Sequence, residues 1–85
     1  MNSYSCFRDF DTISNKTTLH VFENDTDLYK YLIKQDIFKV QDDVDSERAM
    51  TKEEEQDFLE YTTINYNLGE LVDFILKNQQ VELHI

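Results

Sequence analysis

The spacing of apolar residues changes along the chain, and the first changes predict a β-hairpin. Segments 4–13 and 18–23 are short and rich in aromatic and β-branched residues, which is typical of strands. Residues 14–17 between them are turn formers. Because side chains alternate along a strand, Leu19 and Val21 should share one face, opposite their neighbours in sequence.

Three later segments have the features of helices. Asn24 and Thr26 both suit the N-cap of a first helix over about 27–34. A T-x-x-E sequence at Thr51 is a capping box and predicts a second helix, with apolar contacts from Phe58, Leu59 and Tyr61. Apolar residues at positions i, i+3, i+4, i+7 and i+8 predict a third helix whose apolar face packs in the core: Leu68, Leu71, Val72, Ile75 and Leu76.

The chain closes on an alternating segment, 81–85, which predicts a strand with Val81, Leu83 and Ile85 facing inward. This strand should join the N-terminal hairpin. Segment 35–41 fits a strand or a further helical turn equally well. With no proline and one glycine, residues 1–85 form one predicted α+β domain of order β-β-α-α-α-β.

Aromatic content separates this chain from a disordered acidic tail, which is poor in aromatics. Six Phe and five Tyr predict a folded domain with one compact core. A chain of this length buries only about 60% of its unfolded surface, so a homodimer would add useful burial. Six aromatic residues exceed what one small core requires: Tyr29, Tyr31, Phe38, Tyr61, Tyr66 and Phe74. Either ordinary core packing with some exposed tyrosines or a partner interface would account for them.

Cysteine usage and hydropathy bear on the compartment. No segment has the roughly 18 apolar residues of a membrane span, and the N-terminus has no secretory signal pattern. Cys6 is the only cysteine, so no disulfide forms within the chain, whereas small secreted domains usually rely on disulfides. These features predict a cytoplasmic protein, in a bacterial host cell if the resemblance described below holds.

Negative charge is concentrated in one segment. The chain has a net charge of −10, and residues 41–60 account for −7 of it. Such a block repels itself unless a basic partner offsets it. Nucleic acids and anionic membranes are polyanions and therefore poor partners. The predicted partner-binding residues are the nine acids of this segment: Asp42, Asp43, Asp45, Glu47, Glu53, Glu54, Glu55, Asp57 and Glu60.

A helical acidic segment would have a charge density comparable with that of DNA. Twenty helical residues span about 30 Å, over which a DNA duplex carries roughly 18 charges. The nine acids reach about half of that density, and two copies in a homodimer would come close. The segment therefore predicts binding to a basic DNA- or RNA-binding protein. The alternative is a solvated acidic face that only aids solubility.

Residues 43–54 also resemble the twelve-residue EF-hand calcium loop. Oxygen donors fall at positions 1, 3, 5, 9 and 12, and a predicted helix follows. The sixth position, which requires glycine in that family, is Arg48, whose charge would lie beside the metal. Calcium binding is therefore the weaker interpretation of the acidic segment.

Residues suited to catalysis are few. His20 and His84 lie far apart in sequence, and the chain has no H-x-x-x-H, C-x-x-C or glycine-rich loop. Cys6 could in principle pair with a histidine, but a lone cysteine in an aromatic strand favours a core position. A catalytic carboxylate pair needs a pocket, for which 85 residues leave little room. The sequence predicts no enzyme, no cofactor and no metal site.

In size, acidity and aromatic content the chain resembles small early proteins of bacteriophages, such as the anti-restriction proteins of T-even phages and acidic anti-CRISPR inhibitors. This resemblance implies a phage-encoded inhibitor that presents a DNA-like surface to a host restriction, CRISPR or transcription protein. One alternative is an antitoxin or immunity-type protein that plugs the basic active site of a nuclease or toxin. A third interpretation is an adaptor whose acidity serves solubility.

Overall fold

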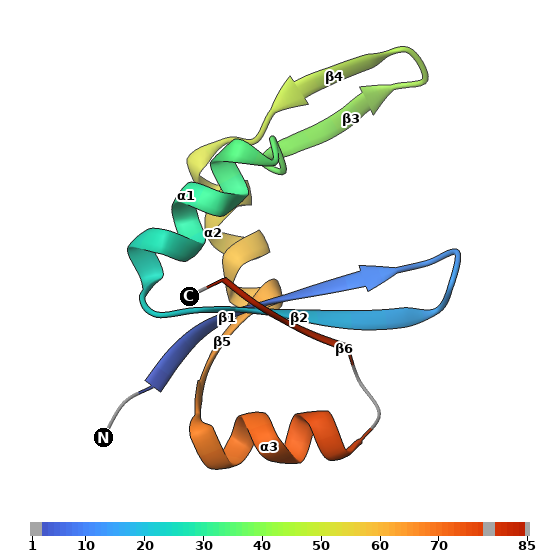
Figure 1. Ribbon diagram of the computed structural model, residues 1–85. Helices are drawn as coiled ribbons and strands as arrows, with labels where there is room; N and C mark the ends of the chain where they lie inside the picture. The colour runs from blue at the N-terminus through green and yellow to red at the C-terminus, as the bar shows by residue number, and fades with distance from the viewer. Residues whose placement is uncertain (1–2, 78–79, 85) are drawn as a thin grey trace.

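A four-stranded sheet separates two helical layers (Figure 1). The computed structural model describes residues 3–77 and 80–84. Its elements, in chain order, are β1 (Ser3–Asp11), β2 (Lys16–Phe22), α1 (Asp25–Lys34), β3 (Lys39–Asp43), β4 (Ser46–Ala49), α2 (Lys52–Thr62), β5 (Thr63–Asn67), α3 (Leu68–Leu76) and β6 (Gln80–Leu83). The strand order across the sheet is β5-β1-β2-β6, and α3 covers the face opposite α1 and α2.

The predicted hairpin is confirmed as β1–β2, with antiparallel register Cys6↔Val21 and Phe7↔His20. Strand β5 also pairs antiparallel with β1, and β6 pairs parallel with β2. The C-terminal strand therefore joins the hairpin, as the sequence predicts. Leu83, predicted to face inward, is largely exposed near the end of this edge strand, and Ile85 lies outside the described residues.

Alternation along the central strands gives two hydrophobic clusters, where the sequence predicted one core. Cys6, Leu19 and Val21 face α3 and pack with Leu71. On the other face, beneath α1 and α2, a second cluster is formed by Phe7, Phe22, Leu28 and Leu32. Four of the six aromatic residues that exceeded the needs of one core pack against one of these two clusters: Tyr31, Phe38, Tyr66 and Phe74.

Each helix begins at a residue whose side chain caps it. Asn24 Oδ1 accepts a hydrogen bond from the Asp27 amide at 2.8 Å, which decides between the two predicted N-caps. Thr51 forms the predicted capping box of α2, and Asn67 forms a second capping box at α3. These caps satisfy amides that have no partner within the first helical turn.

The apolar face of α3 differs from its prediction. Of the five apolar residues expected in the core, only Leu71 is buried, and it is joined by the half-buried Phe74. The others, Leu68, Val72, Ile75 and Leu76, are exposed. Helix α3 has nine residues and is the one helix among the described residues on this face of the sheet. It contacts the sheet along a single narrow stripe, so the rest of the apolar surface of the helix is exposed to solvent. Tyr61 of α2, also predicted to make core contacts, is 84% exposed.

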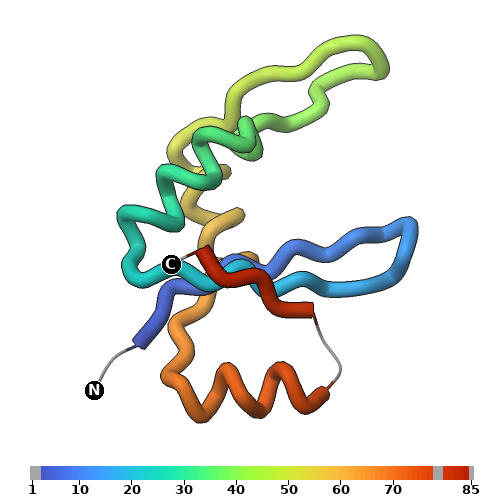
Figure 2. Tube along the Cα trace, viewed as in Figure 1, coloured from blue at the N-terminus to red at the C-terminus, as the bar shows by residue number. Residues whose placement is uncertain are grey.

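The element order is β-β-α-β-β-α-β-α-β, so the α+β class is confirmed but the predicted order is wrong. Strands β4 and β5 were not predicted, and β3 overlaps segment 35–41, which fitted a strand or a helical turn equally well. Strands β3 and β4 form a separate two-stranded sheet that projects from the body (Figure 2). Residues 41–49 are all exposed, so this hairpin buries no apolar face and gives no alternating pattern.

Candidate functional site

The nine predicted acids lie on one structural unit, formed by β3, β4 and α2, on the α1/α2 side of the sheet. We call residues 39–62 the acidic unit. They do not form the continuous helix assumed for the charge-density comparison, because the first four acids lie on the hairpin and its turn: Asp42, Asp43, Asp45 and Glu47. The remaining five acids lie on α2.

Arg48 of β4 connects the hairpin to α2. Its Nη1 and Nη2 atoms donate to the two carboxylate oxygens of Glu54 at 2.7 and 2.9 Å. Its Nε atom lies 3.4 Å from Oδ1 of Asp42. Arg48, followed by the Thr51 amide, lowers the pKa of Glu54 to about 2. Arg48 supplies one positive charge against these two carboxylates, so Glu54, which it binds through both oxygens, is the weakest of the predicted partner-binding residues, and Asp42 is only partly offset.

A row of exposed carboxylates remains along α2. Glu53, Asp57 and Glu60 follow i, i+4, i+7 spacing, so they share one helical face, and all three are exposed. Glu55 instead accepts a hydrogen bond from the Tyr29 hydroxyl at 3.2 Å. The row spans about 10 Å, over which one strand of B-DNA carries about three phosphates.

The tip of the projecting hairpin carries a second acidic group. Val44, which is 82% exposed, lies between Asp43 and Asp45 at the turn. Behind the tip, the hydrogen bond to Asp36 raises the pKa of the Lys39 amine, and Glu47 raises it further by a smaller amount. The tip is thus an acidic projection with an exposed apolar residue at its end.

The segment that resembled a calcium loop has a different structure. Residues 43–49 form the end of β3, a tight turn and β4, and therefore do not wrap around a central point. Glu54, at the twelfth position of the pattern, is held by Arg48 and by the Thr51 amide. The donors at the two ends of the pattern are therefore not arranged as an EF-hand arranges them.

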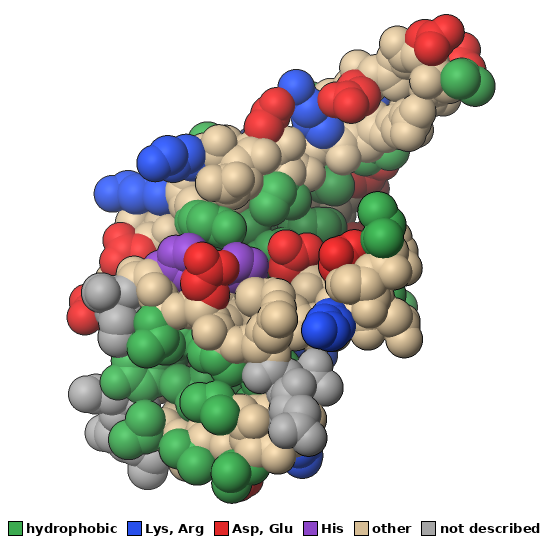
Figure 3. Space-filling view, turned by 45° about the vertical axis from the view of Figure 1, so that its right-hand side comes forward, with side chains coloured by type: hydrophobic (Ala, Val, Ile, Leu, Met, Phe, Trp, Pro, Cys, Tyr) green, Lys and Arg blue, Asp and Glu red, His purple; other side chains and the backbone are tan. Residues whose placement is uncertain are grey.

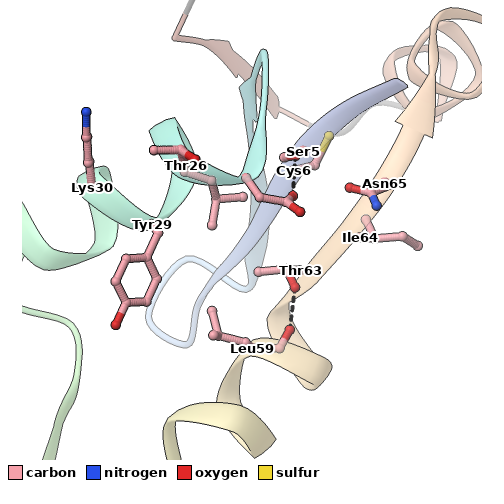
Figure 4. Close-up of a pocket in the computed structure, with 11 residues that line it drawn as sticks. Ser5, Cys6, Thr26, Tyr29, Lys30, Leu59, Thr63, Ile64 and Asn65 are labelled. Atoms are coloured by element: carbon pink, nitrogen blue, oxygen red, sulfur yellow. Dashed lines mark hydrogen bonds between the residues drawn. The ribbon is translucent and has the colours of Figure 1, made fainter. Parts of the chain in front are cut away.

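A pocket of about 620 Å³ opens between the sheet and the helices α1 and α2, contrary to the expectation that the chain has little room for one (Figure 4). Ser5 donates a hydrogen bond to Asp25 at 2.5 Å on one wall, and Thr63 donates to the Leu59 carbonyl on another. Neither histidine lines the pocket among the described residues. Ser5 therefore has the Asp25 carboxylate beside it, and no imidazole from the described lining.

Cys6 is buried in the cluster beneath α3, as its aromatic surroundings in the sequence predict. Burial raises the pKa of its thiol to about 11, so the thiol stays protonated at neutral pH. His20 faces the opposite side of the sheet, against Tyr31 of α1. A Cys6–His20 nucleophile pair is therefore excluded by the alternation of β1 and β2.

The sheet brings together the two histidines that are far apart in sequence. His20 Nδ1 lies 2.9 Å from His84 Nε2 and 3.3 Å from a carboxylate oxygen of Glu82. Its other ring nitrogen, Nε2, lies 3.7 Å from Asp9. Burial lowers the pKa of His20 more than Glu82 and Asp9 raise it, so the imidazole favours its neutral form.

One feature of the sequence is consistent with this cluster, although it is not a helical metal-binding motif. Glu82 and His84 are two residues apart at the C-terminal strand, so they share a face. His20 is paired directly with Glu82 in the parallel register of β2 and β6. The sequence alone does not give the strand that pairs with β6 or the register of that pair, so the contact between His20 and Glu82 could not be predicted.

No protein-family model matches the chain, and neither a curated protein nor a solved structure matches it. Among the described residues, no helix is long and apolar enough to cross a membrane.

Proposed function

We propose that the chain is a non-enzymatic inhibitor that uses its acidic unit to occupy a basic, DNA-binding surface of another protein. The observation that carries this proposal is the exposed row of Glu53, Asp57 and Glu60 on a capped helix. A capped helix presents charges at fixed spacing before binding, whereas a flexible tail would have to become ordered on binding at an entropic cost. Phage origin and a host defence or transcription protein as target follow from the resemblance in size and charge.

The contacts of Arg48 within the acidic unit support the proposal, because they hold the exposed acids in fixed positions. Arg48 offsets one of the two negative charges of Asp42 and Glu54, and it anchors the hairpin on α2. The exposed acids are therefore held by a folded support, which reduces the ordering cost of binding. Charge complementarity would then speed association and fix the orientation of the partner.

The test is displacement from DNA. Proteins from a bacterial lysate are loaded on immobilised duplex DNA, and the purified chain is added at low salt. We expect it to release a small set of DNA-binding proteins and to remain bound to one of them. That complex should weaken steeply with added salt, because charges are screened over about 8 Å at physiological ionic strength. Release of no protein, or a complex insensitive to salt, would contradict the proposal.

The hairpin tip favours a second candidate function, a plug for the basic active site of a nuclease or toxin. A narrow projection with Val44 exposed between two aspartates suits insertion into a cleft better than docking along a groove. The two functions differ in the residues they require. Asp43→Asn with Asp45→Asn should abolish inhibition by a plug, whereas Glu53→Gln with Asp57→Asn should abolish groove binding.

A further inference from the structure

We propose that His20, Glu82 and His84 form a binding site for a divalent first-row transition metal of the Zn²⁺ type, which fastens β6 to the sheet. This site is independent of the acidic unit. It lies at the β2–β6 edge, and Figure 3 shows the two purple histidines beside an acidic side chain at the molecular surface.

The donor spacing suits tetrahedral coordination. One donor atom from each of the three residues lies within 4.8 Å of the other two. Zinc bonds to histidine nitrogen and carboxylate oxygen are about 2.0–2.2 Å long, so adjacent donors in a tetrahedral site lie about 3.3–3.5 Å apart. The separations of 3.3 Å from His20 Nδ1 to Glu82 and 2.9 Å to His84 need only a few tenths of an ångström of adjustment.

The donor chemistry selects the class of metal. Two imidazoles and one carboxylate suit zinc and similar ions, whereas calcium and magnesium prefer sites made wholly of oxygen donors. Three protein ligands occupy three of the four tetrahedral positions. Because the Glu82 side chain is exposed, water can reach the fourth position. The site therefore resembles an open three-ligand centre rather than a closed structural one.

The surroundings hold the histidine rings in place. His84 stacks on Phe22 with ring centroids 4.6 Å apart and an angle of 8° between the planes. Tyr31 packs against both histidine rings. Asp9, at 3.7 Å, faces the nitrogen of His20 that would not bind the metal. A carboxylate in that position fixes the ring orientation and increases the basicity of a metal-binding histidine.

Without a metal ion, one hydrogen bond joins His20 Nδ1 and His84 Nε2 at 2.9 Å, and the carboxylates of Glu82 and Asp9 are exposed to water. A metal ion bound to Nδ1 would replace this hydrogen bond, so the two arrangements compete.

The experiment is a titration of the chelator-treated protein with ZnCl₂, followed by calorimetry and thermal unfolding. We expect one Zn²⁺ per chain, a higher Tm in its presence, and neither effect with CaCl₂ or MgCl₂. Co²⁺ should give visible absorption bands of low-symmetry, four-coordinate geometry. Because Glu82 is exposed, Glu82→Gln should fold normally and weaken Zn²⁺ binding at least about 10-fold, as should His84→Gln.

The matched control is Glu53→Gln with Asp57→Asn, which removes carboxylates from the acidic unit and should leave Zn²⁺ binding unchanged. Zinc binding that is lost in this control but kept in Glu82→Gln would place the ion on the acidic unit and overturn the proposal. Absence of Zn²⁺ binding would equally overturn it.

A separate observation concerns the outer face of α3, which we infer to bind a second copy of this chain. Hydrophobic side chains, coloured green, gather at the α3 end of the molecule, at the bottom of Figure 3. The exposed apolar residues here are Leu68, Val72, Ile75, Leu76 and, from β6, Leu83. The area argues for a partner, because the accessible surface of 6516 Å² exceeds by about 1,200 Å² the roughly 5,300 Å² of a monomer of this mass.

A standard interface buries about 800 Å² on each partner, so the excess is large enough to supply one. The projecting β3–β4 hairpin accounts for part of the excess, and the α3 face accounts for another part. Charge favours the same arrangement. The acidic unit lies on the opposite side of the sheet, so two chains joined through α3 keep their acidic units apart.

Sedimentation equilibrium tests this inference. We expect a dimer that dissociates in the variant Leu68→Gln with Leu76→Gln, while the far-ultraviolet circular dichroism stays that of the folded chain. The control Ile13→Gln changes an exposed apolar residue in the β1–β2 turn and should remain dimeric. A wild-type chain that stays monomeric up to its solubility limit would overturn the inference, as would a Leu68/Leu76 variant that stays dimeric.

Discussion

Arg48 of β4 donates two hydrogen bonds to Glu54 of α2, at 2.7 and 2.9 Å, and one oxygen of the same carboxylate accepts from the Thr51 amide at 2.9 Å. Glu54 therefore completes the capping box of α2 and also anchors the projecting hairpin. A single carboxylate thus sets how the two halves of the acidic unit are joined.

Replacement of Arg48 by Gln should loosen the hairpin, since it removes both hydrogen bonds to Glu54 and the contact with Asp42. We expect faster hydrogen exchange at the amides of β3 and β4 than in wild type. Lys52→Gln removes the same charge from an exposed position on α2 and should leave these rates unchanged. Equal exchange rates in the two variants would show that Arg48 does not hold the hairpin.

Acid should weaken the contribution of Glu54 to stability. Its pKa falls from 4.5 to about 2 on folding, so the stabilisation is fully present above about pH 4.5 and is lost as the pH falls toward 2. Urea denaturation of wild type and Glu54→Gln across this range should show wild type more stable at pH 6 and the difference shrinking toward pH 2. A constant difference would contradict the assigned pKa.

The cap of α3 should contribute about 1 kcal/mol, because Asn67 satisfies the amide of Glu70. Asn67→Ala should lower the free energy of unfolding by that amount. Asn65→Ala changes the same residue type at an exposed position two residues earlier on β5, and should change it by less than about 0.5 kcal/mol. Comparable losses in both variants would argue against the cap.

Leu32, in the cluster beneath α1 and α2, should contribute strongly to stability. Leu32 is fully buried, so Leu32→Ala should cost about 2–5 kcal/mol through lost contacts and the cavity left behind. The neighbouring Ile33 on the same helix is mostly exposed, and Ile33→Ala should cost well under half as much. Chemical denaturation of the two variants measures the contrast, and similar costs would mean that α1 packs differently.

Local signals in the sequence were sufficient for the elements that make local contacts. The β1–β2 hairpin and the cap at Thr51 depend on neighbours within a few residues, so their patterns predict them correctly. Strand β5 follows α2 without a turn residue, and the charged β3–β4 hairpin buries no face, so neither gave a usable pattern. Whether an apolar helical face is buried depends on the size of the sheet beneath it, which explains the exposed side of α3.

The candidate sites were predictable to different extents. The acids of the acidic unit could be found from composition, but the pairing of Asp42 and Glu54 with Arg48 required the hairpin geometry. His20 and Glu82 meet only because β6 adds to the sheet parallel to β2. Sequence separation gives no information on that register, so the cluster was absent from the predicted sites.

Two variants with the same net charge test the central claim, that the position of the exposed acids on α2 determines binding. Glu53→Gln, Asp57→Asn and Glu60→Gln neutralise the row, whereas Glu23→Gln, Asp27→Asn and Asp73→Asn neutralise three exposed acids elsewhere. The affinity of each for the protein released from DNA is measured at low salt. We predict a loss of at least about 10-fold for the row variant, corresponding to about 1.4 kcal/mol, and near wild-type binding for the other. Equal affinities in the two variants would contradict the account, because net charge alone would then explain the binding.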